Sequence, residues 1–310
     1  MIRVKNLVKY YGKRLAVNNI SFNVEKGEIV GFLGPNAAGK TTTMRILTGF
    51  LAPTRGEAWI AGNSLQTSSI EARKHIGYFA EAVPLYTDMT VRSYLDFWAR
   101  LRGLDKHTTK KRINEVIETL VLDEYADTLL GKLSKGYRQR VGVGQAIIHE
   151  PDVLIMDEPT VGIDPIQVAM TRQLIKRLGE KCTILLSTHI LPEVSMTCER
   201  VIIINNGKII AEDKIDNLSS MVGNARRIRL EVQGPSDDIT KNLRQIKGVI
   251  NVKMQDDRHH IVEYPANQDL RSKITEAVVK GGWTLLSMES VELSLEDVFL
   301  KLTTDEDGKE

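Results

Sequence analysis

Apolar and polar residues alternate in short runs at the start of the chain, and this pattern predicts β-strands. The runs are IRVKNLVKYY (2–11), AVNNISFNV (16–24) and GEIVGFLG (27–34), and turn residues separate them. A glycine-rich loop follows the third run. The apolar residues from Met44 to Leu47 then have the spacing of a helix face.

The middle of the chain alternates between helical and strand patterns. Residues 91–148 place apolar side chains three and four positions apart, which predicts helices. Apolar runs at 152–159, 182–189 and 200–213 predict strands, and a helical pattern occupies 165–179. Strands of this kind, joined by helices, predict an α/β fold with a parallel sheet covered on both faces.

The pattern breaks near NLSSMVGNA (217–225), and a smaller domain is predicted after it. Its expected elements are a strand (227–232), a helix (237–246), two strands (249–254 and 260–264), a helix (268–280) and a strand (283–288). This order is typical of a ferredoxin-like α+β domain.

These patterns predict two domains and a tail. The boundaries are 1–218, 224–304 and 305–310, and the last range is expected to be a disordered tail. A final helix is predicted over SLEDVFLKL (294–302), where a serine and an aspartate have the spacing of a capping box.

Charge and composition narrow the classes of function. Residues 1–218 carry 29 basic and 24 acidic side chains, whereas the remainder carries 13 and 16, so the second domain is a poor candidate for a nucleic-acid clamp. Cys182 and Cys198 have no metal or redox spacing and are expected to be reduced thiols of a cytoplasmic protein. The first residues lack the apolar core of a signal peptide, and no apolar run reaches the ~18 residues of a membrane span.

The glycine-rich loop matches G-x-x-x-x-G-K-[ST], the P-loop pattern. Its small residues leave backbone N–H groups free to surround a phosphate at the start of a helix. Lys40 is expected to reach the β- and γ-phosphates, Thr41 to ligate Mg²⁺ and Thr42 to contact the α-phosphate. The loop residues predicted to contact the nucleotide are Gly34, Pro35, Asn36, Ala37, Ala38 and Gly39.

Two acidic residues end the apolar run VLIMDE. Asp157 is expected to orient Mg²⁺ and its waters, while Glu158 polarises the attacking water. The alternative is a pair of carboxylates that merely ends a strand in solvent. The long aliphatic run before the pair and the proline after it argue against that alternative.

The segment LSKGYRQR (133–140) resembles LSGGQ, the signature motif of ATP-binding cassette (ABC) ATPases. The order of P-loop, helical segment, signature, LIMDEP, VGID and STH also matches this family, over roughly residues 2–218. The resemblance implies a RecA-like P-loop core, an antiparallel β subdomain and a helical subdomain at about 85–150. It also implies ATP and Mg²⁺ as ligands.

The resemblance assigns roles to single positions. Tyr11, with Tyr10 as the alternative, resembles the aromatic residue that stacks on adenine. Asp164 in VGID resembles the D-loop aspartate that links two sites. His189 in STH resembles the switch histidine that contacts the γ-phosphate.

In the signature, Ser134 and Gly136 resemble the groups that cap the γ-phosphate held by the opposite subunit. A hydroxyl, a glycine N–H and a helix N-terminus suit an anion. Lys135 and Tyr137 depart from the family pattern but leave these two residues intact.

Two more departures lie near the expected nucleotide. Ala37 replaces a common glycine, which is costly if the position requires a positive φ. Glu81 stands where the family usually has a glutamine that ligates Mg²⁺. A glutamate keeps the oxygen ligand and adds a charge, and the alternative is an exposed loop acid.

Glu81, the signature and the ending LEDVFLKLT together resemble stand-alone ATPase subunits of bacterial ABC-2 type exporters, including gliding-motility-like members. This branch implies a homodimer or heterodimer of ATPase subunits that drives a separate transmembrane permease from the inner face of the cell membrane. The surface that docks this permease is expected near residues 81–89 and the start of the helical segment, with apolar or aromatic residues such as Val83, Leu85 and Tyr86. The C-terminal domain is expected to serve dimer contacts or regulation.

Two other functions are alternatives to the transport ATPase. A soluble ABC ATPase of translation or DNA repair usually joins two cassettes or carries a long coiled coil, and this chain has one cassette and no sustained heptads. An ATP-binding regulator without turnover is disfavoured because Glu158 and His189 are both present.

Overall fold

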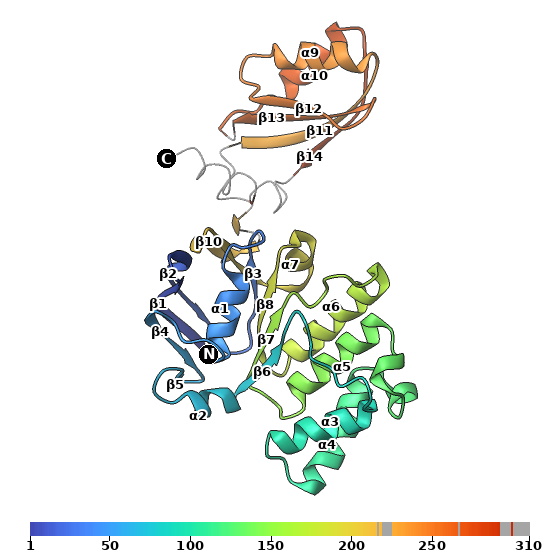
Figure 1. Ribbon diagram of the computed structural model, residues 1–310. Helices are drawn as coiled ribbons and strands as arrows, with labels where there is room; N and C mark the ends of the chain where they lie inside the picture. Colours follow the sequence, from blue (N-terminus) through green and yellow to red (C-terminus); the bar gives the residue numbers. More distant parts are fainter. Residues whose placement is uncertain (216, 219–224, 266, 292–298, 300–310) are drawn as a thin grey trace. The chain divides into compact units, whose positions relative to one another are not determined.

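The computed structural model describes residues 1–215, 217–218, 225–265, 267–291 and 299. The chain divides into two compact units, Met1–Ile215 and Asp216–Glu310 (Figure 1). The predicted tail and, apart from Phe299, the predicted final helix lie outside the described residues.

The first unit contains two β-sheets. The antiparallel sheet has the order β2-β1-β4-β5, and the six-stranded sheet has the order β10-β9-β3-β8-β7-β6. The antiparallel sheet consists of β1 (Ile2–Tyr11), β2 (Arg14–Val24), β4 (Arg55–Ile60) and β5 (Asn63–Ser64). The larger sheet consists of β3 (Ile29–Leu33), β6 (Ile76–Phe79), β7 (Val153–Asp157), β8 (Thr183–Thr188), β9 (Arg200–Asn205) and β10 (Lys208–Lys214). All of its pairings are parallel except that of β10 with β9, which confirms the predicted α/β fold.

Helices connect and cover these strands. They are α1 (Lys40–Leu47), α2 (Ser69–Lys74), α3 (Val91–Leu101), α4 (Lys106–Thr119), α5 (Lys135–Ile147), α6 (Pro165–Gly179) and α7 (Leu191–Thr197). Two short 3₁₀ turns, Asp123–Tyr125 and Leu130–Lys132, lie between α4 and α5. Helices α3, α4 and α5 pack on one another as a helical subdomain (Figure 1).

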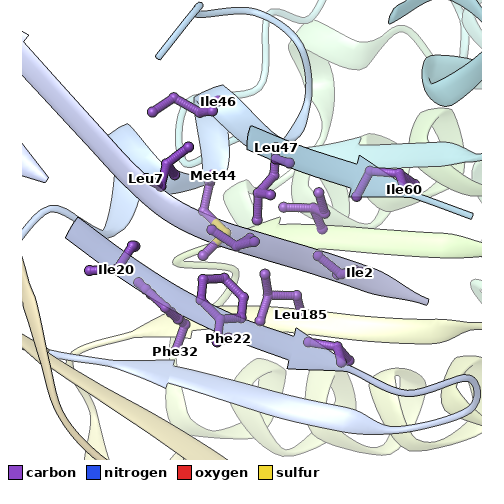
Figure 2. Packing of buried hydrophobic residues seen from close by; sticks show 14 of the residues in the cluster. Ile2, Leu7, Ile20, Phe22, Phe32, Met44, Ile46, Leu47, Ile60 and Leu185 are labelled. Atoms are coloured by element: carbon purple, nitrogen blue, oxygen red, sulfur yellow. The ribbon is translucent and has the colours of Figure 1, made fainter. Parts of the chain in front are cut away.

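The core of the first unit lies where helix α1 packs between the two sheets (Figure 2). Met44 and Leu47 of α1 are fully buried against Ile2 and Phe22 of the antiparallel sheet and Phe32 of strand β3. This packing holds the first turn of α1 at the carboxyl ends of the parallel strands, where ligands bind in open α/β sheets.

The structure corrects the predicted strand at 200–213. Asn206 and Gly207 have φ values of 46° and 76°, so the chain turns back there and forms the hairpin of β9 and β10. Asn-Gly is the preferred pair for a two-residue hairpin whose central residues both need a positive φ. Strands β4, β5 and β6 and helices α2 and α7 were not predicted from the sequence.

The second unit contains a four-stranded antiparallel sheet with two helices. Its elements are β11 (Ala225–Gln233), α9 (Ser236–Arg244), β12 (Asn251–Met254), β13 (His259–Pro265), α10 (Arg271–Lys280) and β14 (Thr284–Val291). The predicted order of elements is confirmed, and the sheet order β12-β13-β11-β14 is that of a ferredoxin-like fold. Its core joins apolar residues of β11, such as Leu230, to Ile239 of α9 and Ile274 of α10.

Candidate functional site

The P-loop connects the buried strand β3 to helix α1. A Cβ atom on Gly34 would come within 2.3 Å of the Ile204 carbonyl oxygen, and Gly39 has a φ of 108°. Gly34 is therefore required because a side chain would collide with the backbone of Ile204, and Gly39 is required because of its positive φ. The loop and the first turn of α1 present backbone N–H groups at the positive end of a helix, which suits a phosphate.

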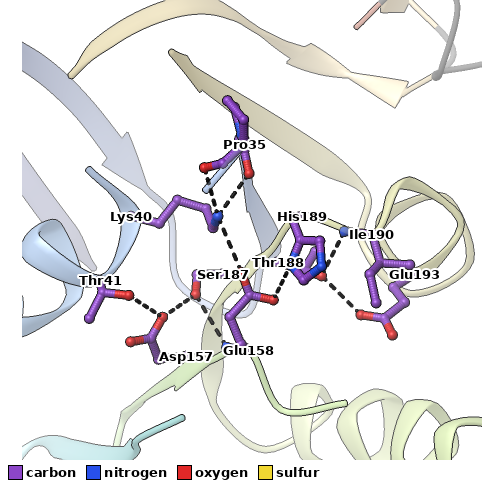
Figure 3. A network of polar contacts seen from close by, with 11 residues as sticks. Pro35, Lys40, Thr41, Asp157, Glu158, Ser187, Thr188, His189, Ile190 and Glu193 are labelled. Atoms are coloured by element: carbon purple, nitrogen blue, oxygen red, sulfur yellow. Dashed lines mark hydrogen bonds and ion pairs between the residues drawn. The ribbon is translucent and has the colours of Figure 1, made fainter. Parts of the chain in front are cut away.

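The side chain of Lys40 is buried in this loop. Its Nζ donates to the carbonyl oxygens of Gly34 at 2.8 Å and Pro35 at 3.1 Å, and lies 3.2 Å from Glu158 Oε1 (Figure 3). The ammonium group thus joins the P-loop to the end of strand β7. A bound phosphate can replace the carbonyl oxygens as the acceptor of hydrogen bonds from Lys40, because charged phosphate oxygens form stronger hydrogen bonds with the ammonium group.

Asp157 is the last residue of strand β7, and its carboxylate faces the first turn of α1. Asp157 Oδ1 accepts hydrogen bonds from Ser187 Oγ at 2.5 Å and Thr41 Oγ1 at 3.3 Å. Asp157 Oδ2 has no hydrogen-bond partner among the described residues. Burial raises the pKa of Asp157, while the two hydroxyls oppose that shift. A divalent cation would favour the ionised carboxylate, so the hard oxygen donors of Asp157 and Thr41 fit Mg²⁺.

Glu158 has an unusual backbone conformation. Its φ is 51°, which a residue other than glycine seldom adopts, and its N–H donates to the Ser187 carbonyl oxygen at 3.0 Å. The carboxylate is held on both sides, because Oε2 lies 2.9 Å from His189 Nδ1 and Oε1 lies beside Lys40. Strained backbone of this kind persists where surrounding contacts hold a functional side chain in place.

Lys40, Thr41, Glu158 and His189 line one open pocket of about 720 Å³, a volume in the range of small-molecule sites. Asp157 and the predicted loop residues Gly34, Pro35 and Ala38 do not line it. The predicted site residues that line it are Tyr11, Asn36, Ala37, Gly39, Lys40, Thr41, Thr42, Glu81, Glu158 and His189. The aromatic alternative Tyr10 lines a separate hollow with Lys5 and Arg55. The geometry therefore favours Tyr11 as the residue beside a bound base.

The signature and D-loop residues do not line this pocket. Ser134 is the N-cap of α5, and its Oγ accepts from Tyr137 N at 3.4 Å. Asp164 is the N-cap of α6 and accepts from Gln167 N at 3.0 Å. Gly136 is buried beneath the side chain of Gln167, which a Cβ on Gly136 would approach to 2.8 Å. In a single chain, the signature residues thus lie outside the pocket that contains the P-loop.

Several residues of the site escaped the sequence analysis. Ser187 donates to the carboxylate of Asp157, and Arg14 and Arg45 line the pocket. A signal existed for Arg45, which follows Thr41 by four positions and so lies on the same helix face. Ser187 could be assigned only after strands β7 and β8 were known to be neighbours.

The structure also tests the conformation at Ala37. Its φ is 65°, a left-handed conformation that is costly for alanine. We expect Ala37→Gly to raise the free energy of unfolding by up to about 1 kcal/mol, because the strain is larger than the entropy that glycine adds to the unfolded chain. Urea unfolding of the nucleotide-free chain measures this difference.

Ala38 provides the matched control, because it is buried and its φ is not positive. The change Ala38→Gly removes a buried methyl group and adds flexibility, so we expect a loss of ~1 kcal/mol or more. Equal destabilisation by both changes would contradict the strain at Ala37.

Comparisons with known proteins agree with this geometry. The family model "ABC transporter" matches residues 17–161. The linearmycin resistance ATP-binding protein LnrL of Bacillus subtilis (strain 168) is 34% identical over 306 residues, which cover 98% of each chain. The bacitracin transport ATP-binding protein BcrA of Bacillus licheniformis is 35% identical over 314 residues, with 97% of each chain covered.

A solved structure of an ATP-binding cassette, dimeric and bound to ADP and Pi, is also similar. It is 26% identical with a TM-score of 0.63, over 69% of this chain and 98% of that chain. The two sheets, the P-loop and the carboxylates at the end of β7 define a P-loop ATPase with an ABC cassette. The chain belongs to the family of ATP-binding subunits of ABC transporters.

Proposed function

We propose that the chain binds Mg²⁺ and ATP, closes head to tail on two ATP molecules with a second ATPase subunit, and drives a separate transmembrane permease. One observation carries the proposal. Lys40, Glu158 and His189 meet in one pocket, while Ser134 and Gly136 lie outside it. Because the signature residues do not line the pocket of their own chain, they are free to contact a nucleotide that is bound to another chain.

Each pocket residue then has a role that its contacts support. Lys40 and the P-loop N–H groups bind the β- and γ-phosphates, and Tyr11 stacks on adenine. Thr41 and Asp157 hold Mg²⁺. Glu81 lines the same pocket and supplies a further oxygen toward the cation.

Two further roles concern the attacking water and the second subunit. Glu158 accepts the proton of the attacking water, and His189 holds Glu158 and reaches the γ-phosphate. Asp164, at the start of α6, lies in the loop that continues from Glu158 and links the two sites of the dimer.

The relatives support a membrane partner. None of the helices in the described ranges is long and apolar enough to cross a membrane. LnrL and BcrA are named for linearmycin resistance and bacitracin transport. We therefore place the chain in the cytoplasm, on the inner face of the membrane, as one of two identical or different ATPase subunits of an exporter.

An exposed aromatic surface marks the docking site that we propose. The ring of Tyr86 packs edge-on against Phe97 at 5.6 Å and Tyr94 at 6.1 Å, yet Tyr86 is 49% and Phe97 is 37% exposed. Val83 was expected to belong to the docking surface, but its side chain packs against Gly142 of α5. The exposed aromatic surface therefore extends from Tyr86 to Phe97 of α3.

This surface gives a test of the transport function. We expect the double change Tyr86→Asp and Phe97→Asp to reduce the membrane-bound fraction of the chain ~10-fold or more, because two charges would have to be desolvated in the contact. ATP binding by the purified chain should be unchanged. Sedimentation of membranes from cells that produce the permease measures the bound fraction.

Val279→Asp is the control, since Val279 is exposed on α10 and lies far along the chain from the docking loop. Membrane association that survives the double change would place the docking site elsewhere. A wild-type chain with ATPase activity and no membrane partner would favour the soluble, non-transport ABC ATPase instead.

A further inference from the structure

A second pocket of the first unit lies between the helical subdomain and helix α6. Its volume is about 540 Å³, and residues at the end of α4, in α5 and in α6 line it. It shares no lining residue with the pocket that contains the P-loop. The volume is in the range of small-molecule sites. The pocket is therefore large enough for a small organic molecule and separate from the proposed ATP site.

The charged residues that line this pocket are all basic. They are Arg140 of α5 and Lys176 and Arg177 of α6, and none of the described residues that line the pocket is acidic. Lys176 and Arg177 are exposed in the last turn of α6. Arg140, by contrast, is only 7% exposed. The pocket thus presents three positive charges, and one of them is buried.

The buried charge of Arg140 has only neutral partners. Its Nη2 donates to Gln167 Oε1 at 2.8 Å and to Met170 Sδ at 2.9 Å, and its Nη1 donates to the Leu120 carbonyl oxygen at 3.5 Å. Its Cζ lies 5.1 Å from the ring centroid of Tyr137. In the ranges that the structure describes, no carboxylate forms an ion pair with Arg140.

An anion in the pocket would give Arg140 a better partner. A buried arginine is usually paired with an opposite charge, because an isolated charge is costly to remove from water. The thioether sulfur of Met170 is a weak acceptor. A carboxylate forms a shorter and stronger hydrogen bond with a guanidinium group than a neutral acceptor does.

Apolar side chains line much of the remaining pocket. Leu120 and Leu174 are buried, whereas Val121 is 54% and Met170 is 40% exposed. A ligand that covered these exposed side chains would remove apolar surface from water. The lining therefore suits a molecule that has an apolar part as well as a negative charge.

Val121 lines the pocket in a costly backbone conformation. Its φ is 53°, which is rare for a β-branched residue. Val121 N donates to the Glu118 carbonyl oxygen and Leu122 N to the Ile117 carbonyl oxygen, both at 3.0 Å. These bonds end α4 in a Schellman motif, which usually has glycine at this position. Glycine would relieve the strain but would remove an apolar side chain from the pocket.

We infer that this pocket binds a small organic anion that carries a carboxylate on an apolar body. The carboxylate accepts hydrogen bonds from Arg140, and Lys176 and Arg177 add electrostatic attraction. The apolar body contacts Val121 and Leu174. This site goes beyond the proposed function, and binding to it requires neither ATP nor a second chain.

Phenylbutyrate is the probe for this site, because it carries one carboxylate on an apolar body at neutral pH. Phenylbutanol is its uncharged counterpart with the same apolar body. Each is titrated, without nucleotide, into the full chain with isotope-labelled Leu, Val and Met methyl groups. The methyl spectra report both the affinity and the place of binding.

We expect saturable shifts at the methyl groups of Val121, Met170 and Leu174 with a dissociation constant of ~3 mM or less, the range for a ligand of this size. Phenylbutanol should bind at least ~10-fold more weakly, because it offers no charge to Arg140. Shifts that spread over both units without saturation would overturn the inference. Equal affinities for the two probes would also overturn it.

The change Arg140→Met tests the buried charge. Methionine keeps a long side chain, and an apolar replacement of a buried charge is often tolerated. We expect phenylbutyrate to bind at least ~10-fold more weakly, while the affinity for phenylbutanol is unchanged. Thermal unfolding checks that the variant is folded. A folded variant that still prefers phenylbutyrate would show that Arg140 does not bind the carboxylate.

A surface variant tests the same charge without touching the buried residue. We expect Lys176→Glu with Arg177→Glu to weaken phenylbutyrate binding at least ~5-fold, because two attractive charges become repulsive. The control, Lys110→Glu with Lys181→Glu, makes the same change of charge at exposed residues outside the pocket. An unchanged affinity in the first variant, or an equal loss in both, would contradict the site.

The change Val121→Gly tests the apolar contact. We expect both probes to bind about 3-fold more weakly, because part of the buried apolar surface is lost. The midpoint of thermal unfolding should not fall, since glycine adopts this φ without strain. Unchanged affinities for both probes would contradict the contact with Val121.

Discussion

Replacing Glu158 with glutamine is expected to lower ATP turnover by ~100-fold or more while ATP binding survives. The glutamine has the same shape, and its amide oxygen can still accept a hydrogen bond from Lys40, which also keeps its bonds to Gly34 and Pro35. What is lost is the carboxylate that takes the proton of the attacking water. Because hydrolysis no longer opens the dimer, an ATP-bound dimer should accumulate.

Two measurements check this expectation. Phosphate release gives the turnover, and gel filtration with ATP shows the dimer. Glu180→Gln is the control, since Glu180 is an exposed acid at the C-cap of α6, outside the pocket. A Glu158→Gln chain that turns over at the wild-type rate would mean that another group activates the water.

The second large effect is expected when two inactive variants are mixed. Lys40→Ala removes the buried ammonium of the P-loop, and Ser134→Arg blocks the signature at the start of α5. If each site combines the P-loop of one chain with the signature of the other, each homodimer is inactive at both sites. A mixed dimer has one site with both defects and one site that is intact.

ATPase activity should therefore appear in the mixture and be absent from each variant alone. Random mixing makes half of the dimers mixed, each with one working site, so about a quarter of the wild-type activity is the upper expectation. Donors from two chains then stabilise the charge that develops at the γ-phosphate. The control replaces the Ser134→Arg chain with one that carries both changes, which leaves no intact site.

Formation of mixed dimers should be measured as well, because two coupled sites can fail together when one is broken. Native mass spectrometry with ATP separates the mixed dimer from the two homodimers by mass. Wild-type chains that dimerise, together with variants that form no mixed dimer and show no activity, would count against a site shared between two chains.

The sequence alone predicted the parts whose physical cause is local. The P-loop could be recognised because a phosphate site needs small residues, a lysine and a helix start within a few positions of one another. Asp157 and Glu158 could be placed at a strand end because the apolar run before them is unbroken. The order of elements in the second unit followed from periodicity, with boundaries displaced by a few residues.

Other predictions failed although a signal was present in the sequence. The hairpin of β9 and β10 was read as one strand, because two buried apolar runs outweighed the Asn206–Gly207 pair between them. Strand β6, only four residues long, was missed because its short apolar run resembles a loop when read alone.

Only the tertiary structure decided which residues meet. Tyr11 lines the pocket, whereas Tyr10 does not. The side chain of Val83 packs against Gly142. Lys40 and His189 lie on opposite sides of the Glu158 carboxylate. These outcomes depend on contacts between segments that are distant in the sequence, or on which face of a strand is covered. Local sequence determines the chemistry that each segment can offer, and the packing of distant segments determines where that chemistry is brought together.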